Sequence, residues 1–409
     1  MSNHVLSTDK NKDINKKIIL ALVILTTTLM TMSTDLFAPS LPFLSEYFNT
    51  NDEMVKLTMS MWMMAYGGIL LIYGPLSEKF GRRPVLVGAM FLFTLASFFC
   101  TTATSIEQLI VARIVQGAAA GAEGVLVMSI VRDCFDEKGQ VWAFSIYRGV
   151  CALPPIFAPI IGTYIYIWLG WQANFILLSA IAAIVTGLLW KYLDESSNTE
   201  RHTVSVSSVL KDYWKLLCSG KFLAFTVIMA TSIAYLVIFP TVVPFVLVNQ
   251  LGQEAEVFGY FQGVIMVAFI FGSTFANKLS KKMSVHGLLF LGICIVALGG
   301  ILLLLVALFE LESLLMLGIP LGIIAFGNGP VMAAAPPLAM GATNSSTGSS
   351  AAMMLTITSA LASATAMIEG AYSSGTSMSL AVILFAVASI SLLAFGAVKL
   401  LGILQTTQN

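Results

Sequence analysis

Long apolar runs constrain the fold of this chain more than any other feature of its sequence. A helix that crosses the hydrocarbon core of a bilayer needs about 20 predominantly apolar residues. The runs are continuous rather than alternating, which excludes strands as the main element, because only closed barrels can span a membrane as strands. The sequence predicts an all-α membrane protein of twelve transmembrane helices, at 18–41, 55–77, 84–103, 106–131, 140–167, 172–192, 221–248, 256–278, 284–308, 312–336, 346–372 and 376–404.

Composition supports a membrane location. Hydrophobic residues make up 57% of the chain and charged residues 10%, whereas soluble domains carry about 25% charged residues. The formal net charge is zero, so nothing suggests a nucleic-acid partner. Charges are few, and their positions carry the information.

Lysine and arginine lie almost entirely on one side of the predicted spans. With an even number of spans, that side also holds both termini: Lys10, Lys12, Lys16, Lys17, Lys79, Arg82, Arg83, Arg132, Lys138, Lys191, Arg201, Lys211, Lys215, Lys221, Lys278, Lys281, Lys282 and Lys399. The opposite loops hold Lys56 and eight acids: Glu46, Asp52, Glu53, Glu107, Glu254, Glu256, Glu310 and Glu312. Because cytoplasmic loops are enriched in basic residues, both termini are expected in the cytoplasm.

One long polar segment divides the chain near its middle. We therefore expect a cytoplasmic tail at 1–17, a six-helix bundle at 18–192, a cytoplasmic linker at 193–220 and a second six-helix bundle at 221–409. Repeats of six spans are a known transporter plan.

Setting aside the charges assigned above to the loops on either side, five charged residues remain within the predicted spans: Asp35, Arg113, Glu123, Arg148 and Glu369. Ionisable groups in the membrane are costly and indicate function by default. Asp35 and Arg113 share a depth near the outer side, so a direct or water-bridged contact is expected. Glu123 and Arg148 share a depth near the inner side. A static salt bridge is the alternative for each pair, and headgroups or water are the alternative partners for Glu369.

The segment from Gly74 to Pro84 packs charges and glycines between two apolar runs. Gly74 and Gly81 permit a sharp turn and close approach. Glu78, Arg82 and Arg83 offer ion pairs that can join two bundles on the cytoplasmic side in one state and release them in another. A loop that only fixes topology is the alternative, but basic residues alone would suffice for that.

This segment resembles the loop signature G-x-L-[SA]-D-[RK]-x-G-R-[RK] of the major facilitator superfamily, with Glu78 in place of aspartate. Residues 109–117 resemble the family motif L-x-x-x-R-x-x-Q-G, whose arginine, here Arg113, is linked to proton transfer. The fifth span resembles the antiporter motif of drug exporters through Gly149, Pro154, Pro155, Pro159 and Gly162, with Ala158 and Thr163 replacing two glycines. Helix packing is the alternative role of these residues.

A narrower resemblance is to the bicyclomycin and chloramphenicol resistance subfamily. Its residues are Thr34 to Pro42, Ile130 to Asp133, Trp171, Phe175, Val243 to Leu247 and Phe326 to Pro330, while Gln172 replaces the usual arginine. The resemblance implies a monomeric, proton-coupled exporter of small drugs in a bacterial inner membrane, with two bundles around a central cavity that work by alternating access.

Aromatic and amide side chains are expected to line that cavity: Trp62, Tyr66, Tyr147, Phe239 and Asn328. Methionines crowd the second span at Met54, Met59, Met61, Met63 and Met64, where lipid contact or core packing is the simpler interpretation.

Motifs that are absent from the sequence narrow the function. The chain has no G-x-x-x-x-G-K-[ST], H-E-x-x-H or G-x-S-x-G pattern, so we expect no ATP-binding loop, no metal, no cofactor and no enzymatic activity. The expected partners are a small-molecule substrate, protons and lipid. Three alternatives stay open: a dedicated carrier of one metabolite in either direction, for which Arg113 and Arg148 suit an anion, a receptor or scaffold, and an intramembrane enzyme.

Overall fold

The computed structural model describes residues 2–194, 206–311, 313–343, 347–372 and 376–406, and within these ranges it is helical with no strand. The first half contains α1 (Ser2–Asp35), η1 (Ala38–Ser40), α2 (Leu41–Tyr47), α3 (Asp52–Phe80), α4 (Arg82–Thr101), α5 (Ile106–Cys134), α6 (Glu137–Cys151), α7 (Pro154–Leu169) and α8 (Gln172–Tyr192). The second half contains α9 (Val206–Leu217), α10 (Gly220–Phe245), η2 (Val246–Gln250), α11 (Ala255–Leu279), α12 (Val285–Leu308), α13 (Leu314–Gly341), α14 (Thr347–Tyr372) and α15 (Ser377–Thr406).

Twelve helical segments of the described chain are long and apolar enough to cross a membrane, as predicted. They are Lys16–Tyr47, Asp52–Phe80, Arg82–Thr101, Ile106–Cys134, Trp142–Leu169, Gln172–Tyr192, Gly220–Gln250, Ala255–Leu279, Val285–Leu308, Leu314–Gly341, Gly348–Tyr372 and Ser377–Leu400. The helices extend past the apolar runs because polar turns continue the same backbone hydrogen bonding. Most of the predicted N-terminal tail, for instance, continues α1, which begins at Ser2, whereas the first candidate span begins at Lys16.

Proline divides two of these spans into shorter helices. The first span ends its long helix at Asp35 and continues through η1 and α2, which carry Pro39 and Pro42 at their starts. The fifth span breaks between α6 and α7, just before Pro154. Proline lacks an amide N–H and is tolerated in the first turn of a helix, so each new helix begins where its proline lies.

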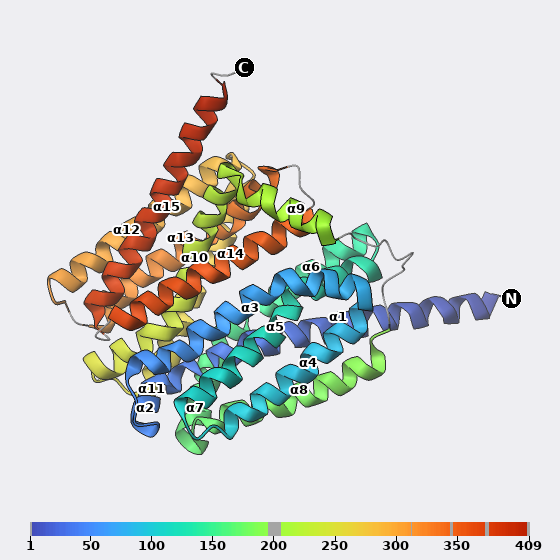
Figure 1. The fold of residues 1–409 in the computed structure, drawn as a ribbon, viewed down its shortest axis with the longest axis horizontal. Coiled ribbons are helices and arrows are strands. Elements are labelled where there is room, and N and C mark those ends of the chain that lie inside the picture. Colours follow the sequence, from blue (N-terminus) through green and yellow to red (C-terminus); the bar gives the residue numbers. More distant parts are fainter. Residues whose placement is uncertain (1, 195–205, 312, 344–346, 373–375, 407–409) are drawn as a thin grey trace.

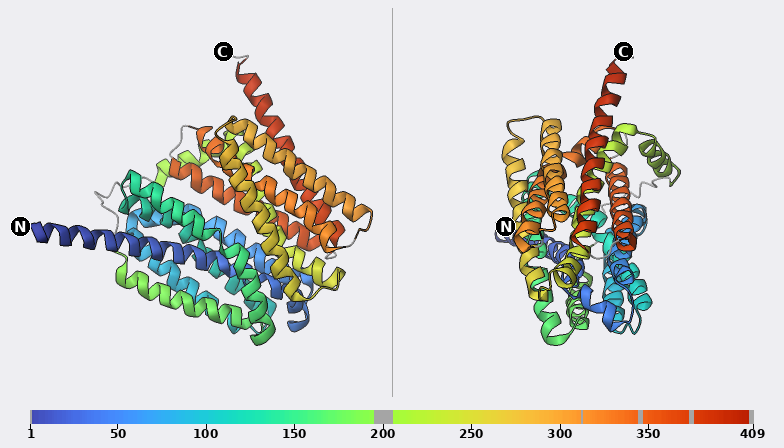
Figure 2. Two further views of the ribbon diagram at one scale, coloured as in Figure 1. Left: turned by 180° about the vertical axis from the view of Figure 1, so that it is seen from behind. Right: turned by 90° about the vertical axis from the view of Figure 1, so that its left-hand side faces the viewer.

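The helices form two bundles, α1 to α8 and α10 to α15 (Figure 1). The front and back views show the bundles closest at the end that holds α2 and η2, and diverging toward the end from which the chain termini project (Figure 1 and the left panel of Figure 2). We call the end with α2 and η2 the far face and the opposite end the termini face. The predicted linker at 193–220 is not only a loop, since it contains α9, which packs on α10 and α14. Leu216 of α9 is buried and Trp214 is exposed, so α9 is amphipathic.

Helix pairs α3–α14 and α7–α11 join the bundles. Small residues allow the close approach: a Cβ at Gly67 of α3 would collide with Ser359 of α14, and one at Gly259 of α11 would lie 3.1 Å from the Ile160 backbone of α7. Small interfacial residues are typical of packed membrane helices, because lipid supplies little driving force for their association.

Candidate functional site

A cavity of about 290 Å³ lies between the two bundles. The first bundle contributes Thr31, Thr34, Asp35, Met59, Trp62, Met63, Cys151, Ala152 and Pro155, and the second contributes Ile233, Leu236, Val237, Pro240, Gln262, Met266, Phe269 and Ile270. Asp35 is the one charged side chain among these lining residues. Met59 and Met63 therefore face the cavity, contrary to the simpler interpretation of the methionine cluster.

Asp35 is held across the bundle interface. It is the last residue of α1, and it is 7% exposed. Nε2 of Gln262, on α11, donates a hydrogen bond to Asp35 Oδ1 at 3.2 Å. Sequence reasoning did not single out Gln262, although an amide inside an apolar run was a usable signal. The cavity thus contains a carboxylate whose hydrogen-bond partner belongs to the other bundle.

Arg113 is fully buried inside the first bundle. Its Nη1 donates to the Ser33 carbonyl at 3.1 Å and to the Gln116 side chain, and its Nε donates to the Thr58 carbonyl at 3.4 Å. Gln116 in turn donates to Ser97 Oγ at 2.8 Å. This network joins α1, α3, α4 and α5 around one guanidinium.

Aromatic rings complete the surroundings of Arg113. Its Cζ lies 5.4, 5.6 and 5.8 Å from the ring centroids of Phe37, Trp62 and Phe175, which is the range of cation–π attraction. Trp62 also lines the cavity, and so does Met59, whose sulfur lies 3.5 Å from Arg113 Nη2. The guanidinium therefore contacts two cavity residues but is not itself a lining residue.

The expected Asp35–Arg113 pair is not among the ion pairs of the described residues. Asp35 ends α1 and faces the cavity and α11, whereas Arg113 enters the space between α1 and α3. Their expected equal depth stays a prediction, and the two side chains leave their helices in different directions.

Glu123 lies on α5, where Tyr147 Oη donates to its Oε1 at 3.2 Å. Glu123 is partly buried and is not a lining residue of the cavity. The backbone of Arg148 belongs to α6, but its side chain lies outside the described residues. The Glu123–Arg148 pair therefore stays a prediction.

Glu369 pairs with Lys56, a contact that the sequence did not predict. Lys56 Nζ lies 3.4 Å from Glu369 Oε2, and the two side chains are 1% and 0% exposed. On the sequence alone, Lys56 counts with the outer loops, at the start of the predicted span 55–77. In the structure α3 starts at Asp52 behind the Asn51 cap, so Lys56 falls in the second turn of the helix, where it is buried against α14.

Residues 23–367 match the model of one protein family, described as the Major Facilitator Superfamily. The chain belongs to the major facilitator superfamily. This superfamily consists of membrane transporters, so the protein is a multi-pass membrane transporter and not an enzyme.

Relatives and solved structures agree with the family. A chloramphenicol resistance protein of Pseudomonas aeruginosa is 26% identical over 315 residues, 75% of this chain and 73% of the relative. The multidrug transporter MdfA of Yersinia pestis bv. Antiqua (strain Angola) is 25% identical over 329 residues, 79% of each chain. A crystal structure of a bacterial homolog of the human lysosomal transporter Spinster, inward-facing and unoccupied, has a TM-score of 0.73 at 14% identity and covers 94% of this chain and 97% of its own. At that identity the likeness shows the fold alone.

The superfamily loop signature lies mostly on helix. Gly74 and Glu78 belong to the last turns of α3, and a Cβ at Gly74 would meet nothing within 4 Å, so the expected turn at Gly74 is wrong. Gly81 makes the turn, with φ of +99°, a region that favours glycine. Arg82 contacts Asp133 of α5 at 3.4 Å, and Arg83 donates to the Trp190 carbonyl of α8. These contacts lie within the first bundle, and Glu78 is exposed.

The antiporter-like residues surround the break between α6 and α7. Pro154 and Pro155 start α7, and Pro159 lies inside it. A Cβ at Gly162 would collide with the Leu36 backbone, so this glycine lets α7 approach the end of α1 beside Asp35. Gly149, in α6, has open space around it.

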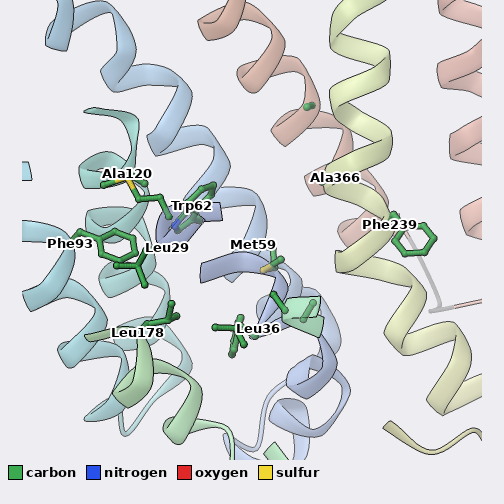
Figure 3. Packing of buried hydrophobic residues seen from close by; sticks show 14 of the residues in the cluster. Leu29, Leu36, Met59, Trp62, Phe93, Ala120, Leu178, Phe239 and Ala366 are labelled. Atoms are coloured by element: carbon green, nitrogen blue, oxygen red, sulfur yellow. The ribbon is translucent and has the colours of Figure 1, made fainter. Parts of the chain in front are cut away.

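Four of the five expected cavity residues are not among the lining residues of this cavity. Phe239 is 1% exposed and packs on Phe258 and Phe261 within the second bundle. Figure 3 shows it directed away from Met59 and Trp62. Asn328 is 1% exposed inside α13. Tyr66 stacks on Trp62 with centroids 5.6 Å apart, and Tyr147 binds Glu123. Aromatic residues fill bundle cores as readily as cavities, which the sequence alone does not distinguish.

The described residues contain no group of three or more His, Cys, Asp or Glu side chains that could hold a metal ion. The site is instead a largely apolar chamber with one carboxylate, built from helices of both bundles.

Proposed function

We propose that this transporter exports small drug-like molecules across the bacterial inner membrane in exchange for protons. The observation that carries the proposal is the carboxylate of Asp35, which lines the interbundle cavity and is hydrogen-bonded to Gln262 of the opposite bundle. A proton bound there changes both the charge of the cavity and the contact between the bundles.

The orientation follows from the basic residues, which assign the termini face to the cytoplasm. Three hydrogen bonds join the second bundle to α3 between its far-face end and its middle, and α3 accepts each of them: Asn249 donates to the Asp52 carboxylate, Ser363 to the Ser60 carbonyl and Thr356 to the Gly67 carbonyl. Tyr164 and Tyr260 meet at 2.7 Å between α7 and α11. These contacts support an inward-open state, in which the periplasmic side is closed and substrate enters from the cytoplasm or the inner leaflet.

Cavity chemistry favours neutral or cationic substrates. Trp62, Phe269 and three methionines supply adaptable apolar contacts, and Asp35 supplies negative charge. Arg113 is not a lining residue of the cavity, and its guanidinium is held by carbonyls and aromatic rings. A dedicated carrier of an anionic metabolite, the alternative function, would need a cation exposed in the cavity.

In the proposed cycle, Asp35 takes up a proton from the periplasm in the outward-open state and loses it to the cytoplasm in the inward-open state. Glu123, bound by Tyr147, is proposed as a second proton site near the cytoplasmic side. Glu78, Arg82 and Arg83 are proposed to form the cytoplasmic gate. In the inward-open state this gate is open, and the residues join the second bundle only when the cytoplasmic side closes. The working unit is proposed to be a monomer.

The test compares two modes of transport in proteoliposomes. Asp35→Asn is expected to abolish substrate movement driven by a pH gradient, while substrate exchange without a gradient continues, because the cavity keeps its shape but loses its titratable group. Glu254→Gln, which changes an exposed carboxylate on the far face, is the matched control and should keep both modes. Gradient-driven transport by Asp35→Asn at the wild-type rate would refute the assignment.

A further inference from the structure

We infer that Lys56 and Glu369 form the outer gate of this transporter and are working residues of the transport reaction rather than a fixed structural ion pair. The inference rests on the proposed alternating access, but it does not depend on the identity of the substrate or on proton coupling.

The pair joins the two bundles directly. Lys56 lies on α3 of the first bundle and Glu369 on α14 of the second, with Nζ and Oε2 separated by 3.4 Å. Neither side chain is more than 1% exposed. An ion pair that is shielded from water is screened very little, so removing one of its two charges while the far face is closed is costly.

The pair is poorly satisfied apart from this attraction. Neither Lys56 Nζ nor either oxygen of Glu369 has a hydrogen-bond partner among the described residues. Lys56 also contacts the Phe245 ring, whose centroid lies 5.2 Å from Nζ. A permanent buried ion pair needs additional hydrogen bonds to repay its desolvation. Arg113 shows the contrast, since three of its contacts are hydrogen bonds to oxygen atoms of the first bundle.

A marginal pair of this kind suits a contact that must break in every cycle. Both charges regain their hydration when the far face opens, which lowers the cost of separating them. In the closed state, however, each charge depends on the other. In the closed state the two charges are therefore compensated by their attraction to each other rather than by a dense hydrogen-bond network.

Its position is where a gate must lie. Lys56 is one helical turn from Ser60, and it is on the far-face side of Met59 and Trp62, which line the cavity. Asp52, one turn further out, meets Asn249 at 3.3 Å. Gly370, beside Glu369, packs against the Lys56 stem, and a Cβ there would lie 3.6 Å from it, in ordinary van der Waals contact. Release of substrate toward the far face requires α3 and α14 to separate along this line.

The experiment measures the opening of the far face without substrate or gradient. In the full-length protein with its five native cysteines replaced, spin labels are placed at the exposed positions Glu46 and Glu254 on the far face, and at Lys79 and Lys281 on the termini face. Distance distributions are recorded in lipid nanodiscs for the parent protein, Glu369→Gln, Lys56→Met and the charge-reversed pair Lys56→Glu with Glu369→Lys. Glu53→Gln, an exposed carboxylate in the first turn of α3, is the matched control.

Each single substitution leaves a buried charge unpaired in the closed state only. The expected result is a rise of about tenfold or more in the ratio of far-face-open to far-face-closed molecules, with a matching shortening on the termini face. Charge reversal should restore the parent distribution, and Glu53→Gln should leave it unchanged.

Parent-like distributions for Lys56→Met and Glu369→Gln would overturn the inference. If one single variant does not fold, the other single variant and the charge-reversed pair decide the matter by the same criterion. If this transporter moves substrate without protons, the proposed coupling is refuted. The distance distributions would still decide whether Lys56 and Glu369 form the outer gate.

Discussion

Gln262 gives the Asp35 carboxylate a donor from the opposite bundle, and this contact makes a prediction at the scale of one residue. Gln262→Met keeps the volume but removes the donor, which weakens the ionised form of Asp35. We expect the pH at which substrate-driven proton release is half-maximal to move upward by about one to two units, since a hydrogen bond to a charged group contributes roughly 1.5–3 kcal/mol.

Gln253→Met is the matched control, because Gln253 makes its side-chain hydrogen bond to the Leu251 carbonyl, outside the cavity. The prediction is checked by titrating proton release in vesicles of the two variants and of the parent. An unchanged profile for Gln262→Met would show that the contact does not hold Asp35 during transport.

The sequence located the membrane charges but not their partners. Hydropathy predicts how deep Asp35, Arg113 and Glu369 lie in the membrane, because the position of a residue along a span of known orientation sets its expected depth. It does not give the direction in which each side chain leaves its helix. That direction sends Asp35 to Gln262, encloses Arg113 among carbonyls and rings, and brings Lys56 to Glu369.

At the scale of helices, Gly162 controls the packing of α7 against the end of α1. Gly162→Ala would push a Cβ into the Leu36 backbone, and overpacking of this kind costs about 1–3 kcal/mol. We expect a lower melting temperature of the purified protein. Gly149→Ala is the matched control, since a Cβ there meets open space and alanine is the better helix former by about 1 kcal/mol. Equal melting temperatures for the two variants would contradict this account of the contact.

The membrane-spanning helices were predictable because each of the twelve apolar runs is long enough to cross a bilayer. The break before Pro154 coincides with the antiporter-like residues that the sequence singled out. The extension of α3 through Gly74 and Glu78 was not predictable from composition, because polar residues at the end of a span are compatible with either a helix or a loop.

At the scale of the whole molecule, transport requires the far-face contacts between α3 and the second bundle to open. Asp52→Cys with Asn249→Cys, joined by a short bifunctional methanethiosulfonate that forms a reducible disulfide with each cysteine, should hold that face closed, because the native side chains meet at 3.3 Å. We expect transport to fall to background after cross-linking and to return after reduction. Each single cysteine variant treated with the same reagent is the control, and continued transport by the cross-linked protein would contradict the movement.

Family membership and the two-bundle fold follow from patterns that extend along the chain, whereas the cavity depends on which helix faces meet. Trp62 was identified from the sequence as a cavity residue, but Met59, Met63 and Gln262 were not, because lining residues and core residues have the same apolar character.

The central claim is that substrate export and proton entry are one coupled process through the Asp35 cavity. The most direct test is to energise inside-out vesicles until the lumen is acid, add neutral, cationic and anionic compounds in turn, and record the pH gradient. We predict that neutral or cationic compounds collapse the gradient in vesicles with the native protein and not in those with Asp35→Asn. No collapse by any compound, from protein shown to be inserted, or an equal collapse with Asp35→Asn, would contradict it.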